Sequence, residues 1–365
     1  MDTTDPSIKF SYEGICDNCQ QYEKITKNFW ENKQNNKEEF TQILKKIKFN
    51  KKGKYDCILG LSGGVDSSYL LHYAVTKLGL SPLVFHVDGG WNSDISVSNI
   101  KSLVSKLNLD LFTEVINWEE MRIFQLAFFK SGQPHIDIPQ DHAFISTLYN
   151  YANKNGIKWI LNGGNISTEC IRNPLKYFYY GTDMKHINYI RKNFGANKMH
   201  TYPFSSIIRH KIWLRYVKRV KVLKILDFIN YNKAEALNEL EQIYGWKPYP
   251  RKHFESRFTR YFEGYWLPSR FGFDTRRVQY SSLIQTNQLT REEAIKKLEF
   301  PEFTEKEADE ESRYVANKLK ISYQELMEYK SMPKKYYYDY PNSYSFFEFG
   351  AKILQNLGLE AGIKR

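Results

Sequence analysis

The sequence contains few cysteines, and their spacing argues against a disulfide-rich secreted protein. Among 365 residues there are 4 Cys, of which only Cys16 and Cys19 lie close together. A disulfide framework in a small secreted domain needs a denser set of paired cysteines. We therefore expect reduced thiols and a cytoplasmic location.

The sequence also lacks a segment that would direct secretion or membrane insertion. Residues 1–6 contain neither the basic start nor the apolar stretch of a signal peptide. No uninterrupted apolar run reaches the roughly 20 residues that a transmembrane helix needs. The expected protein is soluble and has no membrane span.

The composition suits a globular chain with a basic surface. Hydrophobic residues make up 42% and charged residues 26%, enough for one large domain or two ordinary ones. The formal net charge of +12 attracts anions such as nucleic acid, acidic lipid or phosphorylated substrates. The 27 Tyr and 24 Phe predict either aromatic-filled cores or surfaces on which bases or sugars stack.

Between residues 51 and 205, apolar strands alternate with amphipathic helices. This alternation predicts an α/β fold, a doubly wound, Rossmann-like parallel sheet with helices on both faces. An N-terminal segment, 1–50, would precede this domain, and a mostly helical substrate and partner region, 206–365, would follow it. The expected strands are 55–61, 82–87, 109–116 and 157–161, and the expected helices 66–77, 95–107, 118–130 and 141–154.

The region after residue 206 carries helix signals of two kinds. Residues 207–230 predict one long helix, whose basic side chains form either a solvated face or a docking surface for an acidic partner, membrane or nucleic acid. Capping boxes, in which Ser or Thr precedes Glu by three residues, predict three later helix starts. The pairs are Thr290 with Glu293, Thr304 with Glu307, and Ser322 with Glu325.

The most specific motif is a serine- and glycine-rich string directly after the first strand. Two glycines allow a close backbone approach, and the N–H groups that start the next helix attract anions. The three serine hydroxyls can donate further hydrogen bonds, so the string predicts a pyrophosphate cradle. It consists of Leu61, Ser62, Gly63, Gly64, Val65, Asp66, Ser67 and Ser68.

This string differs from two commoner phosphate loops. It has neither the G-x-x-x-x-G-K-[ST] nor the G-x-G-x-x-G spacing. Because the lysine of the first pattern is missing, we expect the loop to hold the β- and γ-phosphates of ATP as a leaving group. The α-phosphorus would then be attacked, and pyrophosphate released.

The string resembles that of the N-type ATP pyrophosphatases, which include GMP synthetase, NAD synthetase, asparagine synthetase and several tRNA-modifying enzymes. The resemblance implies an adenine nucleotide α-hydrolase-like fold, with ATP and Mg²⁺ as cofactors. It implies that the end of the second strand binds adenosine, and that Asp66 and Glu169 are candidate Mg²⁺ ligands. The other nucleotide-binding candidates are His86, Val87, Asp88, Gly163 and Asn165.

Longer strings resemble the N-acetyl sugar amidotransferases of bacterial surface-polysaccharide synthesis, of the lipopolysaccharide, O-antigen and pseudaminic-acid type. The family implies conversion of an N-acetyl group on a sugar into an acetamidino group. The amide oxygen would attack ATP to give an O-adenylyl imidate, ammonia would add, and AMP would leave. The strings span nearly the whole chain, at 2–6, 14–19, 137–144, 252–259, 271–277, 281–284 and 290–294.

Two pairs of residues in the second half are candidates for the chemistry. Lys252 could reach the phosphates, and His253 could orient the substrate or move a proton near neutral pH. Arg276 and Arg277 could bind a sugar carboxylate or diphosphate. The alternatives are structural roles for the first pair and a surface position for the arginines.

Asp141 and His142 form a third pair, which could contact sugar or ammonia or simply begin a helix. For the ammonia itself the sequence offers no glutaminase nucleophile, because Cys57 lies inside a strand. The resemblance implies a separate glutaminase subunit, and free ammonium is the alternative.

The pair Cys16 and Cys19 supplies half of a tetrahedral zinc site. The family pattern has a second C-x-x-C upstream of residues 2–6, so we expect this sequence to begin late, with a truncated zinc module. Two alternatives remain for this pair: it binds Zn²⁺ together with other ligands, or the two cysteines are plain thiols.

Two rival functions remain. A tRNA-modifying ATP pyrophosphatase, such as a thiolase, would explain the charge and the Cys pair, but it usually needs cysteines near the loop. We therefore do not expect nucleic acid as a partner. The second rival is a non-enzymatic nucleotide-binding scaffold for glycan assembly.

Overall fold

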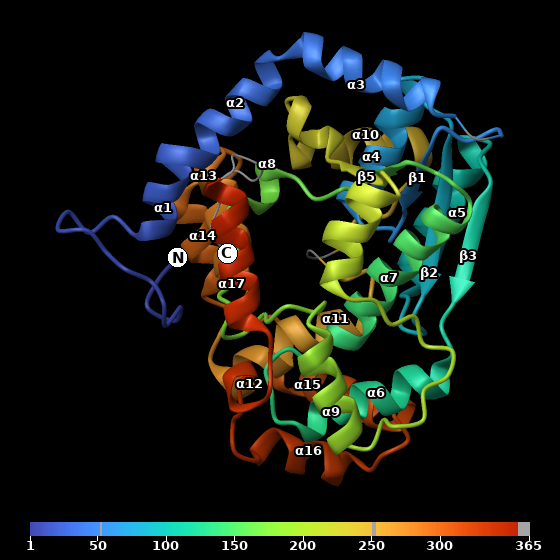
Figure 1. Ribbon diagram of the computed structural model, residues 1–365. Coiled ribbons are helices and arrows are strands. Elements are labelled where there is room, and N and C mark those ends of the chain that lie inside the picture. The colour runs from blue at the N-terminus through green and yellow to red at the C-terminus, as the bar shows by residue number, and fades with distance from the viewer. Residues whose placement is uncertain (52, 250–252, 357–365) are drawn as a thin grey trace.

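A computed structural model of the chain describes residues 1–51, 53–249 and 253–356 (Figure 1). At its centre is a five-stranded sheet in the order β3-β2-β1-β4-β5, and every neighbouring pair is parallel. This confirms the predicted doubly wound sheet. The strands are β1 (Cys57–Gly60), β2 (Pro82–Asp88), β3 (Leu111–Val115), β4 (Trp159–Leu161) and β5 (Lys221–Leu223).

Helices cover both faces of the sheet because the strand residues alternate in direction. Cys57 and Leu59 pack into one core with α4, α5 and α10, and Ile58 packs into another with α7. All three strand residues are fully buried. These helices are α4 (Val65–Thr76), α5 (Asp94–Lys106), α7 (Ile138–Lys154) and α10 (Lys233–Tyr244).

The order of the strands determines where a ligand can bind. The chain winds outward from β1 through β2 to β3 in one direction, and through β4 to β5 in the other. In open α/β sheets of this kind, ligands bind beyond the carboxyl ends of the strands, where the winding reverses. Here that point lies between β1 and β4.

The N-terminal segment forms an arc of helices from α13 to the sheet in Figure 1. At one end, the side-chain amide of Gln285 in α13 (Arg276–Gln285) donates a hydrogen bond of 3.1 Å to Cys19 Sγ. At the other end, Ile47 is fully buried in the core around β1. The arc consists of α1 (Asp17–Gln21), η1 (Tyr22–Thr26), α2 (Lys27–Asn35) and α3 (Lys37–Phe49).

Beyond β4 the described chain is mostly helical and builds a second, strongly aromatic core. In it, Trp91 packs on Phe258 with 4.9 Å between ring centroids, and Phe129 on Trp266 with 4.8 Å. Much of the aromatic content therefore serves packing. The remaining helices are α6 (Trp118–Lys130), α8 (Ile166–Glu169), α9 (Met184–Asn193), α11 (Arg257–Tyr261), η4 (Phe262–Trp266), α12 (Leu267–Phe271), α13 (Arg276–Gln285), α14 (Arg291–Leu298), α15 (Glu305–Lys318), α16 (Tyr323–Ser331), η5 (Tyr337–Asp339) and α17 (Tyr344–Asn356).

The prediction of a single helix for residues 207–230 is wrong. A π-helix, η2 (Arg209–Val217), ends before Arg219, whose φ of 57° is left-handed and stops helix propagation. Strand β5 then pairs with β4, and a short 3₁₀ helix, η3 (Ile225–Phe228), follows. Pairing at the edge of the sheet therefore overrides the helical pattern in this segment.

The predicted capping boxes are confirmed at two of three places. Thr290 and Thr304 each exchange both hydrogen bonds with the glutamate three residues later. Ser322 accepts from the backbone N–H of Glu325, but the Glu325 carboxylate bonds the hydroxyl of Tyr329 instead of closing the box.

Candidate functional site

A cavity of about 640 Å³ opens at the reversal point of the sheet. One wall is the glycine loop, residues 61–68, which joins β1 to α4. A second wall is segment 162–169, which follows β4. The third wall comes from the C-terminal half and includes Tyr249, Glu255 and α13.

Both glycines of the loop stand where a side chain would not fit. Gly63 has a φ of 85°, and a Cβ there would lie 2.9 Å from Ser96 Oγ. A Cβ at Gly64 would lie 2.7 Å from Glu255 Oε1. Both contacts are shorter than a real Cβ tolerates. Position 63, with its left-handed φ, therefore needs glycine, whereas a side chain at position 64 would require the Glu255 carboxylate to move.

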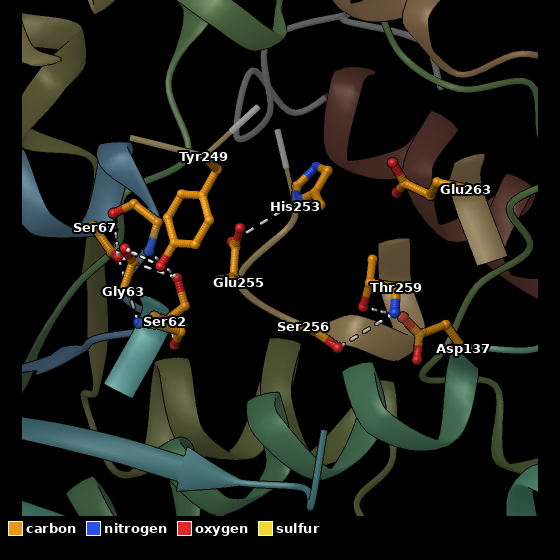
Figure 2. Close-up of polar contacts among 12 residues, drawn as sticks. Ser62, Gly63, Ser67, Asp137, Tyr249, His253, Glu255, Ser256, Thr259 and Glu263 are labelled. Carbon is orange, nitrogen blue, oxygen red and sulfur yellow. Dashed lines mark hydrogen bonds and ion pairs between the residues drawn. The ribbon is translucent and has the colours of Figure 1, made fainter. Parts of the chain in front are cut away.

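Hydrogen bonds hold the loop in this shape (Figure 2). The Ser62 and Ser67 hydroxyls lie 3.1 Å apart, and the Ser67 hydroxyl donates to the Gly64 carbonyl at 3.2 Å. The Tyr249 hydroxyl donates to the Gly63 carbonyl at 3.0 Å. Ser62, Gly64 and Ser67 line the cavity, and the helix that starts at Gly64 directs its positive end there.

Several predicted nucleotide-binding residues lie behind the loop. Ser68 is buried and accepts a hydrogen bond from Trp246 Nε1 at 3.2 Å. The buried ring of His86 bonds the Leu61 carbonyl through Nδ1, at 2.8 Å. Val87 packs in the sheet core, and Asp88 accepts from the Gly90 N–H at 2.7 Å. Ser68 and His86 therefore support the loop from behind, whereas Val87 and Asp88 lie at the end of β2.

Two predicted carboxylates do face the same cavity. Asp66 lies in the first turn of α4, and Glu169 ends α8. The Tyr231 hydroxyl donates to Asp66 Oδ1 at 2.6 Å; burial, reinforced by the charge of Asp66, raises the pKa of that phenol well above its usual value. The Asp66 side chain is therefore fixed at the edge of the glycine loop.

Gly163 and Asn165 bring Glu169 to this place. A Cβ at Gly163 would lie 3.1 Å from the Ser67 nitrogen, a tight contact, so glycine favours the close approach of the two loops. Asn165 is buried and caps α8 by accepting from the Thr168 N–H at 2.9 Å. Segment 162–169 therefore packs directly on the glycine loop.

The donor groups suit magnesium better than zinc. Mg²⁺ is usually held by one or two carboxylates together with substrate phosphates, and Asp66 and Glu169 provide that set. Within the described ranges, no group of three His, Cys, Asp or Glu residues is placed to hold a metal alone.

The cysteine pair is close but does not complete a zinc site. Cys16 Sγ and Cys19 Sγ lie 3.4 Å apart, and burial raises the pKa of Cys19 to about 11. In the part of the chain that the structure describes, no third ligand of the usual types joins them.

Sequence reasoning missed Glu255, although it lies two residues from a predicted site residue. His253 lines the cavity with a φ of 66°, and its Nδ1 lies 4.0 Å from Glu255 Oε1 (Figure 2). Lys252, the other predicted catalytic residue, lies outside the described residues. The only signal for Glu255 was its place in the string 252–259.

Backbone pairing and a buried polar network fix Glu255. The Ser93 N–H donates to the Glu255 carbonyl at 2.9 Å. The next residue, Ser256, accepts from Gln140 Nε2 at 3.1 Å, and Gln140 also donates to Asp137. Burial raises the pKa of Asp137 well above its usual value, and its two oxygens accept hydrogen bonds from Gln140 and Thr259. The Glu255 carboxylate is thereby held against the glycine loop.

The structure does not bring the four predicted substrate-binding residues into the cavity. Asp141 lies 3.4 Å from His135, and the buried ring of His142 bonds the Gly181 carbonyl at 2.6 Å. Arg276 is buried, and its guanidinium is taken up by Asp274 and by the carbonyls of Lys297 and Phe300. Arg277 forms an ion pair with Asp2.

Other residues line the wall opposite the glycine loop, and nothing in the sequence marked them. They combine two ammonium groups with hydroxyl and amide groups, a set that can bind an anionic and hydroxylated ligand. They are Lys233, Gln279, Tyr280, Gln288 and Lys297.

Residues 255–354 match a family model described as "LPS biosynthesis protein WbpG-like, C-terminal domain". This match confirms the resemblance to WbpG-like proteins of lipopolysaccharide biosynthesis, and it begins at the residue that contacts Gly64. One relative, "Uncharacterized protein MJ1599" of Methanocaldococcus jannaschii, is 31% identical over 126 residues, which are 34% of this chain and 43% of that protein. The chain thus spans less than half the length of that relative.

Two solved structures were also found. An NH₃-dependent NAD synthetase from Campylobacter jejuni shares 15% sequence identity, covering 84% of this chain and 98% of its own, with a TM-score of 0.32. An NMN synthetase from Francisella tularensis shares 18%, covering 60% and 98%, with a TM-score of 0.28.

Proposed function

We propose that this chain, with its WbpG-like C-terminal region, is an ATP-dependent amidotransferase. It would convert an acetamido group of a bacterial surface-polysaccharide sugar into an acetamidino group, with release of AMP and pyrophosphate. One observation carries the proposal. The glycine loop, the carboxylates of Asp66 and Glu169, and a polar wall from the WbpG-like region all line one cavity.

The loop supports cleavage between the α- and β-phosphates. Its serine hydroxyls and the start of α4 would bind the two outer phosphoryl groups, leaving the α-phosphorus toward the opposite wall. Mg²⁺, held by Asp66 and Glu169, would neutralise the charge that develops on pyrophosphate. Tyr231 would keep Asp66 oriented for this purpose, through its 2.6 Å hydrogen bond.

The opposite wall would hold the sugar with its amide oxygen toward the nucleotide. An amide carbonyl is a poor electrophile, and its oxygen is a poor leaving group. Adenylation of that oxygen gives an imidate from which AMP departs after ammonia adds to carbon. The protein contributes mainly positioning and electrostatic stabilisation. His253 lies between the two walls and would orient the substrate or accept a proton.

Ammonia would come from a partner glutaminase subunit. Cys57 and Cys170 suit neither glutamine hydrolysis nor tRNA thiolation. Cys57 is fully buried in β1, and burial raises its pKa well above the usual value. Burial also raises the pKa of Cys170 to about 12. Both effects disfavour the reactive thiolate.

The test is incubation of the full chain with ATP, Mg²⁺, ammonium and a panel of acetamido sugars, read by mass spectrometry and nucleotide analysis. The proposal predicts AMP, pyrophosphate and a sugar whose mass has changed by replacement of one oxygen with NH. The Asp66→Asn variant should lose pyrophosphate release. Formation of ADP and orthophosphate, or AMP transfer to tRNA without any amidine, would contradict it.

A further inference from the structure

The helix η2 leaves an unusual amount of apolar surface uncovered. Positions four and five apart share a face in a helix with i→i+5 hydrogen bonds, so these side chains form one stripe. Single exposed apolar residues are ordinary, but a contiguous stripe marks an interaction surface. The stripe consists of Ile208 (52% exposed), Ile212 (53%), Trp213 (49%), Tyr216 (52%) and Val217 (54%).

The opposite side of η2 attaches it to the protein. Leu214 is fully buried beside Ala152 of α7, in the core behind the sheet. The His210 ring stacks on Tyr149 of the same helix, with 4.7 Å between centroids. These contacts orient the stripe away from the core, and the neighbouring edge strand β5 extends it with Val222, which is 42% exposed.

The stripe lies within the most basic part of the chain. Residues 184–226 contain 11 Lys and Arg and neither Asp nor Glu, which nearly equals the net excess of +12 for the whole sequence. The Arg215 guanidinium lies 5.5 Å from the Tyr216 ring centroid, and the Lys218 ammonium 5.6 Å from that of Trp213. Cationic groups therefore flank the apolar stripe directly.

We propose that this surface, the η2 stripe with its flanking cations, docks the protein on an anionic lipid bilayer. Such bilayers attract basic segments and accept Trp, Tyr and aliphatic side chains at the headgroup boundary. Nucleic acid would use the cations but leave the aliphatic residues exposed to water. Protein interfaces favour Arg but are depleted in Lys, whereas Lys218 and Lys221 lie beside the stripe.

The contact is peripheral. No helix in the described ranges is long and apolar enough to cross a bilayer. Attachment through a stripe of aliphatic and aromatic side chains plus a few charges is reversible and weakens as salt screens the cations. The proposal does not depend on the reaction catalysed, because the stripe shares no residue with the cavity walls.

The test is sedimentation of the full chain with vesicles of equimolar phosphatidylglycerol and phosphatidylcholine, and with vesicles of phosphatidylcholine alone. We expect binding to the anionic vesicles only, reduced by added salt. Ile212→Ser with Trp213→Ser should abolish it. A matched pair on other exposed apolar residues, Ile295→Ser (53% exposed) with Phe300→Ser (70%), should leave it unchanged.

A second variant separates charge from apolar contact. Arg215→Gln with Lys218→Gln should weaken binding by about fivefold for each cation removed. Circular dichroism of every variant checks that the fold is retained. Absence of binding to anionic vesicles, or binding insensitive to the Ile212 and Trp213 changes, would overturn the proposal. The proposal would also be overturned if an RNA displaced the protein from vesicles and bound the Ile212→Ser, Trp213→Ser variant as tightly as the unchanged protein.

Discussion

The carboxylate of Glu255 occupies a place that an anionic ligand would need. A Cβ at Gly64 would lie 2.7 Å from its Oε1, so the carboxylate lies at the positive end of α4. A phosphoryl group bound by the same loop would stand close to this negative charge. We therefore predict that Glu255→Gln strengthens the binding of metal-free ATP.

The size of the effect follows from the charges. At a separation of about 6 Å and an effective dielectric constant of about 20, two unit charges repel each other by about 3 kcal/mol. Allowing for solvent and for adjustment of the side chain, metal-free ATP should bind about tenfold to a hundredfold more tightly to the Glu255→Gln variant. With Mg²⁺ present the gain should be much smaller, because the cation offsets the repulsion.

Isothermal titration calorimetry with ATP in excess chelator, and again in Mg²⁺, measures both values. Glu310→Gln is the matched control, because its side chain is 64% exposed and lies in the solvated part of α15. Weaker binding of metal-free ATP to the Glu255→Gln variant would refute the reasoning. An equal change with and without Mg²⁺ would also refute it.

Three further outcomes are expected. Gly63→Ala should lose nucleotide binding, measured by calorimetry. Alanine rarely adopts a φ of 85°, and its Cβ would lie 2.9 Å from Ser96 Oγ, so the loop would be distorted. Unchanged binding would contradict this. Tyr231→Phe should slow pyrophosphate release while costing about 1 kcal/mol in unfolding free energy, since one hydrogen bond to Asp66 is lost; an unchanged rate would show that this bond does not orient the carboxylate. Burial lowers the pKa of His186 from 6.5 to about 4, so its ring stays neutral in the folded state at a pH where the unfolded state binds a proton. The free energy of unfolding should therefore fall by up to about 3 kcal/mol as the pH drops across that interval. Thermal unfolding should show a smaller decline for His186→Phe.

Local signals predicted the part of the site built on the sheet. Strand β1, the glycine loop and α4 are contiguous in sequence, so apolar runs and paired glycines suffice to place them. Glu169 followed from a resemblance alone, and the structure shows that Asn165 caps the helix that carries it. The fold class was equally readable, because alternation of strands and helices leaves few topologies.

The remainder depended on contacts between distant segments. Arg276 matched a carboxylate-binding pattern, but Asp274, two residues away, occupies its guanidinium. The β5 segment has helical periodicity, yet Val222 pairs with Ile160 at the edge of the sheet. Glu255 reaches Gly64 only because residues nearly two hundred positions apart fold together. A pattern within one short stretch of sequence cannot show which other residue or strand will pair with its residues.

The bridge between Asn92 and Ser256 has a practical consequence for the expression of fragments of this protein. It joins the loop after β2 to the WbpG-like region. The adjacent Trp91 is buried and packs against Phe258. A fragment ending ahead of residue 255 would expose that indole to water and lose one wall of the cavity. We therefore expect such a fragment to aggregate or to be digested by proteases.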